Sequence, residues 1–151
     1  MAVFEFKISD WLETLKIQTQ PSVKLFDPVR KRWMAETPEE VVRQCLIQYL
    51  CLGHGIPYSR MAVEKQVAVY QLKKRFDLVI YNKLAEAYVL IECKAPHIQI
   101  DQYVLDQAAR YNIQLKAPYL LVSNGQTSLM CQVDFIKSSY DFTDMLPDYP
   151  F

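Results

Sequence analysis

The amino-acid sequence predicts an α/β fold in which helices cover both faces of a central β-sheet. Two runs, 75–81 and 88–94, are rich in β-branched and aromatic residues and are separated by the turn-like Asn82-Lys83. The second run is apolar on both faces, which is typical of a central strand covered on two sides. Segments 37–53 and 101–116, on either side of the two runs, repeat apolar residues at helical spacing.

The first helix has a clear start. Thr37 takes the N-cap position, Pro38 the first helical position, and Glu40 completes a capping box. The helix is predicted to end near Gly53. Its apolar face is formed by Val42, Cys45, Leu46 and Tyr49.

The two glutamates at this helix start are predicted to differ in direction. At 100° per residue, Glu39 lies at the rim of the apolar face, with Arg43 one turn on as a partner, while Glu40 points nearly opposite. The alternative is that both simply stabilise the helix dipole. Which of the two is the functional acid of the first helix stays open.

The remaining elements follow from shorter patterns. We expect strands at 63–70, 118–123 and 128–135, the last two joined by Asn124-Gly125, and a helix at 101–116 in which Gln107 and Tyr111 lie one turn apart. Nearer the N-terminus we expect a strand at 3–8, a short helix at 11–17 and an extended segment at 22–27. His54, between two glycines, is expected to be exposed. The tail 138–151 either packs on a neighbouring surface or stays loose.

Composition limits the classes of function. The 151 residues suit a single domain, 1–151, and the 17 basic residues balance the 17 acidic ones. A zero net charge counts against a tight stand-alone DNA binder, although it allows a locally basic face. The two basic stretches 30–32 and 73–75, the second expected in a turn, contact phosphates or are simply solvated.

Several classes of site are disfavoured. Four cysteines without a Cys-x-x-Cys pair argue against zinc, and three glycines cannot form a Walker-type loop, so we expect no ATP hydrolysis by that route. No charged-then-apolar leader opens the sequence and no run approaches ~18 apolar residues, so we expect a cytoplasmic protein that does not enter a membrane.

Asp77, Glu92 and Lys94 are the candidates for chemistry. Glu92 and Lys94 project from the same face at the end of the second strand, and Asp77 can lie beside them in a hairpin. An Asp followed by Glu-x-Lys on the next strand resembles the active-site pattern of the PD-(D/E)XK nucleases. Two carboxylates, with the main-chain carbonyl of Cys93, offer oxygen ligands to Mg²⁺, or to Mn²⁺ in its place. Lys94 would position the attacking water.

Further motifs narrow the resemblance, over roughly residues 23–135. They are Thr37-Pro38-Glu39-Glu40-x-x-Arg43-Gln44, Arg75-x-Asp77, Ile91-Glu92-Cys93-Lys94-Ala95-Pro96, Gln107-x-x-x-Tyr111 and Ser123-Asn124-Gly125. Together they resemble the N-terminal nuclease domain of type I restriction enzyme R subunits, especially its small stand-alone bacterial forms. The motor domains of the full-length family are absent from this sequence.

The resemblance implies a restriction-endonuclease-like αβββαβ core, with a mixed central sheet flanked by helices and extra N-terminal strands. It also implies Mg²⁺-dependent cleavage of DNA phosphodiesters. Asp77 and Glu92 would be metal ligands, Lys94 the catalytic lysine and Glu39 the acidic residue of the first helix. Residues expected to support the site or contact nucleic acid are Arg43, Arg75, Gln107, Tyr111 and Asn124.

Two alternatives remain beside DNA cleavage. One is a non-catalytic DNA-binding or assembly module that keeps the fold, and the other is a nuclease for RNA or branched DNA. DNA is the expected partner, and a homo-oligomer or a partner protein that supplies motor or specificity functions is left open. From repulsion among clustered carboxylates, Asp77→Asn is expected to leave the melting temperature nearly unchanged or raised.

Overall fold

A six-stranded mixed sheet forms the centre of the protein. The computed structural model describes residues 4–69 and 72–151, with side chains described at 4–64 and 75–151. Strand order is β4-β5-β6-β7-β8-β9, with β6 and β7 parallel and all other neighbours antiparallel. The strands are β4 (Met61–Val69), β5 (Leu72–Tyr81), β6 (Ala87–Cys93), β7 (Tyr119–Ser123), β8 (Ser128–Asp134) and β9 (Ser139–Thr143). The predicted α/β fold is confirmed.

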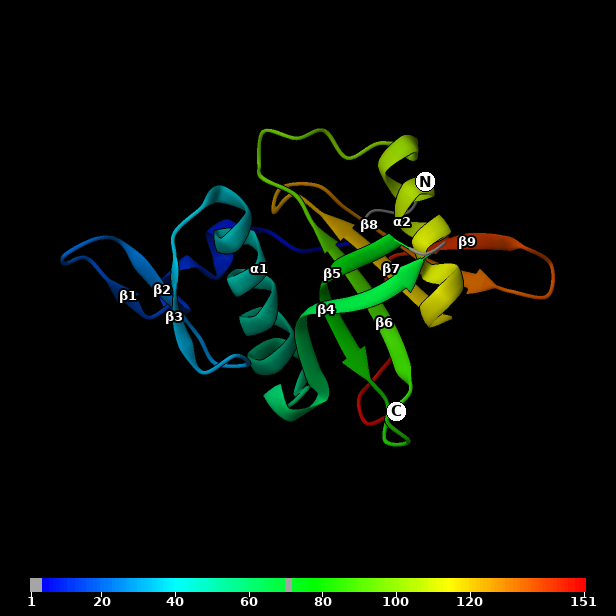
Figure 1. Cartoon of the computed structure of the whole chain (residues 1–151), viewed down its shortest axis with the longest axis horizontal. Coiled ribbons are helices and arrows are strands. Elements are labelled where there is room, and N and C mark those ends of the chain that lie inside the picture. Colours follow the sequence, from blue (N-terminus) through cyan, green and yellow to red (C-terminus); the bar gives the residue numbers. More distant parts are fainter. Residues whose placement is uncertain (1–3, 70–71) are drawn as a thin grey trace.

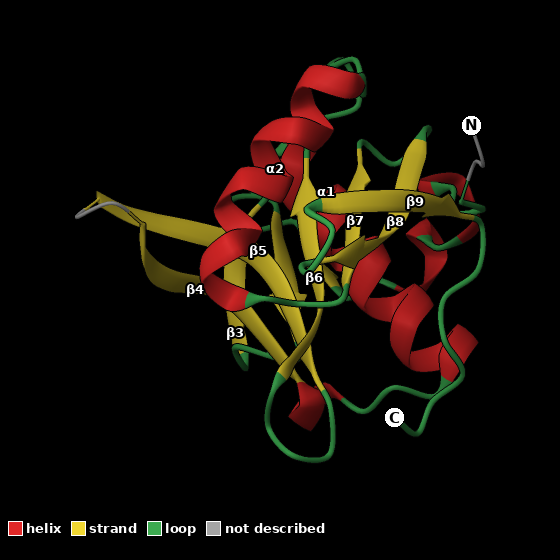
Figure 2. Ribbon diagram, turned by 90° about the vertical axis from the view of Figure 1, so that its right-hand side faces the viewer, coloured by secondary structure: helices red, strands yellow, loops and turns green. Residues whose placement is uncertain are grey.

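Two helices cover opposite faces of this sheet, as Figure 2 shows. Helix α1 (Pro38–Gln48) buries Val42 and Leu46 in the same core cluster as Ile91 of β6, whereas α2 (Gln102–Leu115) buries Leu105 and Ala108 in a second cluster on the other face. Both helices begin as expected: the side chain of Thr37 caps α1 and that of Asp101 caps α2. Among the described residues, none of the helices has the length and apolarity needed to span a bilayer.

A second, three-stranded antiparallel sheet lies on the far side of α1, so that α1 sits between the two sheets (Figure 1). Its strands are β1 (Ile17–Gln18), β2 (Lys24–Asp27) and β3 (Arg32–Ala35). Strand β2 confirms the extended segment predicted at 22–27. This small sheet matters for the site because it covers the side of α1 that the sequence pattern assigns to solvent.

Two N-terminal predictions are wrong. The described part of the segment 3–8 is not a strand: Phe4 and Phe6 enter the core without forming a ladder, and the main chain is held by two hydrogen bonds, Phe4 N to Ser128 O at 3.1 Å and Ile8 N to Gly125 O at 2.9 Å. Segment 11–17 forms only a 3₁₀ turn before β1. The conformation of this segment is therefore set by burial of its aromatic side chains, not by strand pairing.

Among the described residues, four short turns have helical geometry: η1 (Ile8–Asp10), η2 (Leu12–Thr14), η3 (Tyr49–Gly53) and η4 (Tyr58–Arg60).

The first helix ends where it was predicted to end, but the residue that follows it differs from expectation. The helix continues through the π turn η3 to Gly53, where it was predicted to end. His54, expected to be exposed, is partly buried, with its ring 4.7 Å from that of Tyr49. Burial lowers the pKa of His54. The His54 side chain therefore packs against the aromatic cluster at the end of the helix.

The basic stretch 73–75 lies within strand β5 rather than in a turn. Strand β4 confirms the strand predicted at 63–70, except that Tyr70 lies outside the described residues. The side chains of Lys73 and Lys74 are also outside them. Arg75, the last of the three, is 56% exposed.

The C-terminal tail packs on the protein. Strand β9, which has no clear sequence signal, pairs with β8, and Phe151 stacks on Tyr88 with the ring centroids 4.2 Å apart. The main-chain nitrogen of Lys83 donates to the carbonyl of Phe151 at 3.0 Å. Of the two alternatives for residues 138–151, packing on a neighbouring surface is therefore confirmed.

Gly125 is predicted to be the most sensitive glycine. It has φ +85°, and a Cβ added there would lie 2.5 Å from Cγ2 of Ile8 and 3.2 Å from Cγ2 of Val42. Gly125→Ala should lower the free energy of unfolding by about 3 kcal/mol, because it adds backbone strain and overpacks the contact between η1 and α1. Urea denaturation measures this change.

Gly55→Ala is the matched control. Gly55 also has a positive φ, +72°, but a Cβ there would meet nothing within 4 Å. It should cost only the backbone strain, about 1 kcal/mol. Equal costs at the two positions would show that the close approach of Ile8 contributes nothing.

Candidate active site

Asp77 and Glu92 lie on adjacent antiparallel strands. The register pairs Leu78 with Ile91, which places Asp77 next to Glu92 at the same level of the sheet. Oδ2 of Asp77 accepts a hydrogen bond from the main-chain nitrogen of Cys93 at 2.8 Å. The hairpin predicted from the sequence therefore forms, and it places the two acidic residues at neighbouring positions on adjacent strands.

Strand β5 breaks its alternation at Asp77. Phe76 belongs to the core cluster under α2, whereas Leu78, two residues on, belongs to the cluster under α1. On the neighbouring strand β4, Glu64 lies opposite Asp77, between the pairs Val63–Leu78 and Lys65–Phe76, and adopts φ 55°. A left-handed non-glycine residue is costly, and such distortions persist where the surrounding structure imposes them. This distortion lies beside Asp77, whose carboxylate reaches Arg43 on α1.

Glu92 and Lys94 face α2. With Gln107 and Tyr111 they line a small pocket between the end of β6 and that helix, which Val104 and Ala108 complete. Glu92 is only 5% exposed, and the main-chain nitrogen of Lys94 donates to the carbonyl of Ser123 at 2.8 Å. The structure therefore brings together the four residues that the Glu-x-Lys and Gln-x-x-x-Tyr motifs identified.

On the other side, α1 contributes Arg43 and Glu39. Nη2 of Arg43 donates to Oδ1 of Asp77 at 2.8 Å and to Oε1 of Glu39 at 3.3 Å. Burial and the neighbouring charge of Asp77 raise the pKa of Glu39, while Arg43 and Lys94 oppose the shift. These charges act on one another, so Glu39, Asp77 and Lys94 share one electrostatic site.

Glu40 is where the prediction for α1 is wrong. It was expected to point away from the core, yet it is 4% exposed, and its Oε2 accepts from Nη1 of Arg43 at 2.8 Å. Glu39, expected at the core edge, has a side chain that is 45% exposed. The reason is tertiary: the three-stranded sheet covers the face of α1 that a single-helix pattern assigns to solvent.

Arg30 belongs to this buried network and is not part of a solvated loop. It donates to Oδ2 of Asp27 at 2.5 Å, to Oε1 of Glu40 at 2.6 Å and to Oε2 of Glu64 at 3.2 Å. A sequence signal for this turn existed, because Asp27 caps the main-chain nitrogens of Val29 and Arg30 at 2.8 and 2.9 Å. The sequence did not indicate which carboxylates Arg30 binds, so Arg30 was grouped with the basic stretch 30–32.

Burial raises the pKa of the Cys93 thiol well above its usual value, and the charge of Asp77 adds to the shift. The thiol therefore stays protonated at neutral pH and is a poor metal ligand. The group predicted to bind the metal is the main-chain carbonyl of Cys93, and that remains a prediction.

Arg75 and Asn124 lie at the margins of the site. Arg75 precedes Asp77 by two residues, and its Nη1 lies 3.8 Å from Oε2 of Glu64. Asn124 shapes the turn after β7: its Oδ1 accepts from the nitrogens of Gln126 and Thr127, and its Nδ2 donates to the carbonyl of Ile98. These bonds explain Asn124 as a turn residue, and its contact with nucleic acid stays a prediction.

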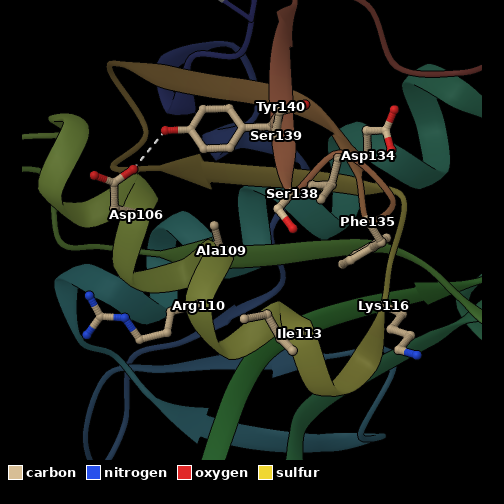
Figure 3. A pocket seen from close by; sticks show the side chains of 11 residues that line it. Asp106, Ala109, Arg110, Ile113, Lys116, Asp134, Phe135, Ser138, Ser139 and Tyr140 are labelled. Atoms are coloured by element: carbon tan, nitrogen blue, oxygen red, sulfur yellow. Dashed lines mark hydrogen bonds between the residues drawn. The ribbon is translucent and has the colours of Figure 1, made fainter.

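A wider groove of about 520 Å³ lies away from these residues, between α2 and the β8–β9 turn (Figure 3). Arg110, Ile113 and Phe135 line it, and the hydroxyl of Tyr140 donates to Asp106 at 2.7 Å across it. None of the predicted site residues lines this groove. Its size alone therefore assigns it no role in the site.

The donor set suits a hard cation. Each oxygen of Asp77 accepts one hydrogen bond, from Arg43 or from Cys93, and a carboxylate oxygen has a second acceptor position. Within the described part of the chain, no three His, Cys, Asp or Glu side chains are arranged to hold a metal ion. Binding of Mg²⁺, which keeps several waters and needs only one or two carboxylates, stays a prediction.

The fold is α/β, and the family that the chain matches makes it a nuclease-related module. Residues 38–147 match the family described as the type I restriction enzyme R protein N terminus, and the chain belongs to that family. The matched region begins at α1 and extends past β9, so the three-stranded sheet lies outside it. Among curated proteins none matches the chain.

Glu39 gives this site a pH-dependent stability. The pKa of Glu39 is raised in the folded protein, so ionisation of this carboxyl lowers the free energy of unfolding. The loss of stability is fully present above the folded-state pKa. It disappears as the pH falls below the ordinary value of 4.5. Glu39→Gln should therefore be more stable than wild type at neutral pH, with the difference vanishing in acid. Urea denaturation between pH 4 and pH 8 measures it.

Glu36→Gln, an exposed acid just before the helix, controls for the change in net charge. The electrostatic description of Glu39 fails if both variants show the same pH profile.

Proposed function

We propose that this domain is a metal-dependent nuclease that hydrolyses DNA phosphodiester bonds. The observation that carries the proposal is that Asp77 and Glu92 occupy neighbouring positions on β5 and β6, with Lys94 beside Glu92 and with Glu39 close enough to feel the charges of Asp77 and Lys94. Membership of the restriction-enzyme family supports DNA as the substrate class.

Asp77, Glu92 and the carbonyl of Cys93 would hold the metal. When bound, Mg²⁺ supplies positive charge for the scissile phosphate and lowers the pKa of a bound water. Glu92, at 5% exposure, would hold the metal in surroundings where water and salt screen its charge only weakly.

Lys94 and Glu39 would act on the water and the phosphate. Lys94 lies beside Glu92 in the α2 pocket and its charge reaches Glu39, which suits a cation that orients the nucleophile and offsets developing negative charge. A raised pKa suits Glu39 to accept a proton from the attacking water.

The DNA backbone would pass over the exposed side of the site. Arg75 is more than half exposed and sits two residues from Asp77, so it can contact a phosphate next to the scissile one. Because the chain as a whole carries no net charge, delivery of the DNA by other subunits of a restriction complex would supply the affinity that the domain lacks.

One observation favours a second candidate, a non-catalytic module that binds DNA or assembles with a partner. Arg43 already donates to Asp77 at 2.8 Å, where it supplies the positive charge that a metal would otherwise bring. A site that Arg43 compensates completely would keep the fold without binding a metal.

The expected effect of Asp77→Asn on stability changes once Arg43 is taken into account. The side chains of Asp77 and Arg43 are 14% and 6% exposed, and removing one partner of such a pair leaves the other charge buried. Asp77→Asn should therefore cost about 3 kcal/mol rather than stabilise the protein. Loss of activity in Asp77→Asn could therefore come from lost stability as well as from a lost catalytic group.

Lys94→Met is the cleaner test. It keeps most of the apolar stem that packs near α2 and removes only the ammonium group. Cleavage of linear, nicked, branched and single-stranded DNA with Mg²⁺ or Mn²⁺ should fall by about 10²-fold or more, with little change in melting temperature.

Lys83→Met, in the exposed turn at the other end of the β5–β6 hairpin, removes an equal charge far along the strands from the site. It should cleave as wild type does. Equal activity of wild type and both variants would refute the catalytic role of Lys94, and absence of cleavage from wild type on every substrate would favour the non-catalytic module.

A further inference from the structure

Five side chains of alternating charge connect the three-stranded sheet to the candidate metal ligand. Arg30 bridges Asp27 and Glu40 at 2.5 and 2.6 Å, and Arg43 bridges Glu40 and Asp77, both at 2.8 Å. We call this set, Asp27, Arg30, Glu40, Arg43 and Asp77, the ion chain. It joins β2, the β2–β3 turn, α1 and β5.

The ion chain is shielded from water along its whole length. Its least buried member is Asp77, and Asp27 is fully buried. Charges in such surroundings are weakly screened, so a change at one end is felt at the other. Dissolved salt likewise screens these buried charges less than it screens charges at the surface.

Arg43 is held unequally. Its Nη1 and Nη2 donate to carboxylates, whereas its Nε is buried and has no hydrogen-bond partner among the described residues. The guanidinium is therefore positioned by the balance between Glu40 at Nη1 and Asp77, with the longer contact to Glu39, at Nη2.

We propose that Arg43 is a built-in cation that competes with a metal ion for Asp77, and that Glu40, neutralised in part by Arg30, sets the strength of this competition. Arg30 is then a positioning residue that acts on Asp77 through Glu40 and Arg43. The metal part rests on the proposed function, whereas the coupling along the ion chain is a property of the metal-free protein.

Two variants should change metal affinity in opposite directions. Glu40→Gln removes the negative charge between the arginines, so Arg43 holds Asp77 more tightly and the dissociation constant for Mn²⁺ rises by about tenfold. Arg30→Met leaves Glu40 uncompensated, which draws Arg43 away from Asp77, and Mn²⁺ binds more tightly by a similar factor of about ten. Calorimetric titration with Mn²⁺ measures both, whereas a merely structural network would weaken binding in both variants.

The coupling has its own test without metal. The cost of Asp77→Asn in the free energy of unfolding, measured with urea, should be smaller in the Arg30→Met background than in wild type and larger in the Glu40→Gln background. If Arg30→Met does not fold, the Glu40→Gln comparison decides, and Arg30→Lys, which keeps the charge but not the three separate donors, should fall between wild type and Arg30→Met.

Arg32→Met is the control. Arg32 lies exposed in β3 beside the ion chain, and its substitution removes the same positive charge as Arg30→Met does. It should leave both measurements unchanged. Equal costs of Asp77→Asn in all backgrounds would overturn the proposal. Absence of Mn²⁺ binding by wild type would count against the proposed function, with the coupling still decided by the unfolding experiment.

Discussion

The contact between Arg43 and Asp77 is the interaction on which the site depends. It joins α1 to the central sheet at the residue that the second carboxylate, Glu92, lies beside. The hydrogen bond from Cys93 fixes the other oxygen of Asp77. One carboxylate is therefore oriented by a helix on one side and by the neighbouring strand on the other, which is the kind of rigid support that catalysis by position requires.

Burying the charges of the ion chain is costly, and the fold offsets this cost because Glu40 and both arginines each bind at least two oppositely charged groups. Glu40 accepts from Arg30 and Arg43, and each arginine bridges carboxylates from different elements. Such networks are weak evidence for stability, but they specify which elements meet and in what register. Here they define how the three-stranded sheet, α1 and the hairpin of β5 and β6 pack together.

Local patterns predicted the parts of the protein that local physics determines. The Thr37 cap, the two central strands and the Gln107–Tyr111 spacing depend on neighbours in sequence, and all three were placed correctly. Glu40 and Arg30 were misplaced because their partners come from a sheet that packs on α1 only in the folded protein. Strand β9 was missed, and segment 3–8 was wrongly predicted as a strand, for the same reason: pairing and burial over long sequence separation leave little trace in a short window.

The most direct test of the account is whether a metal ion binds at Asp77 and Glu92. Mn²⁺ would be titrated calorimetrically into wild type and Glu92→Gln, each alone and with a short DNA duplex. The account predicts binding by wild type, tighter when the duplex is present, and its loss in the variant. Absence of binding by wild type even with the duplex, or equal binding by Glu92→Gln, would contradict a metal-dependent active site.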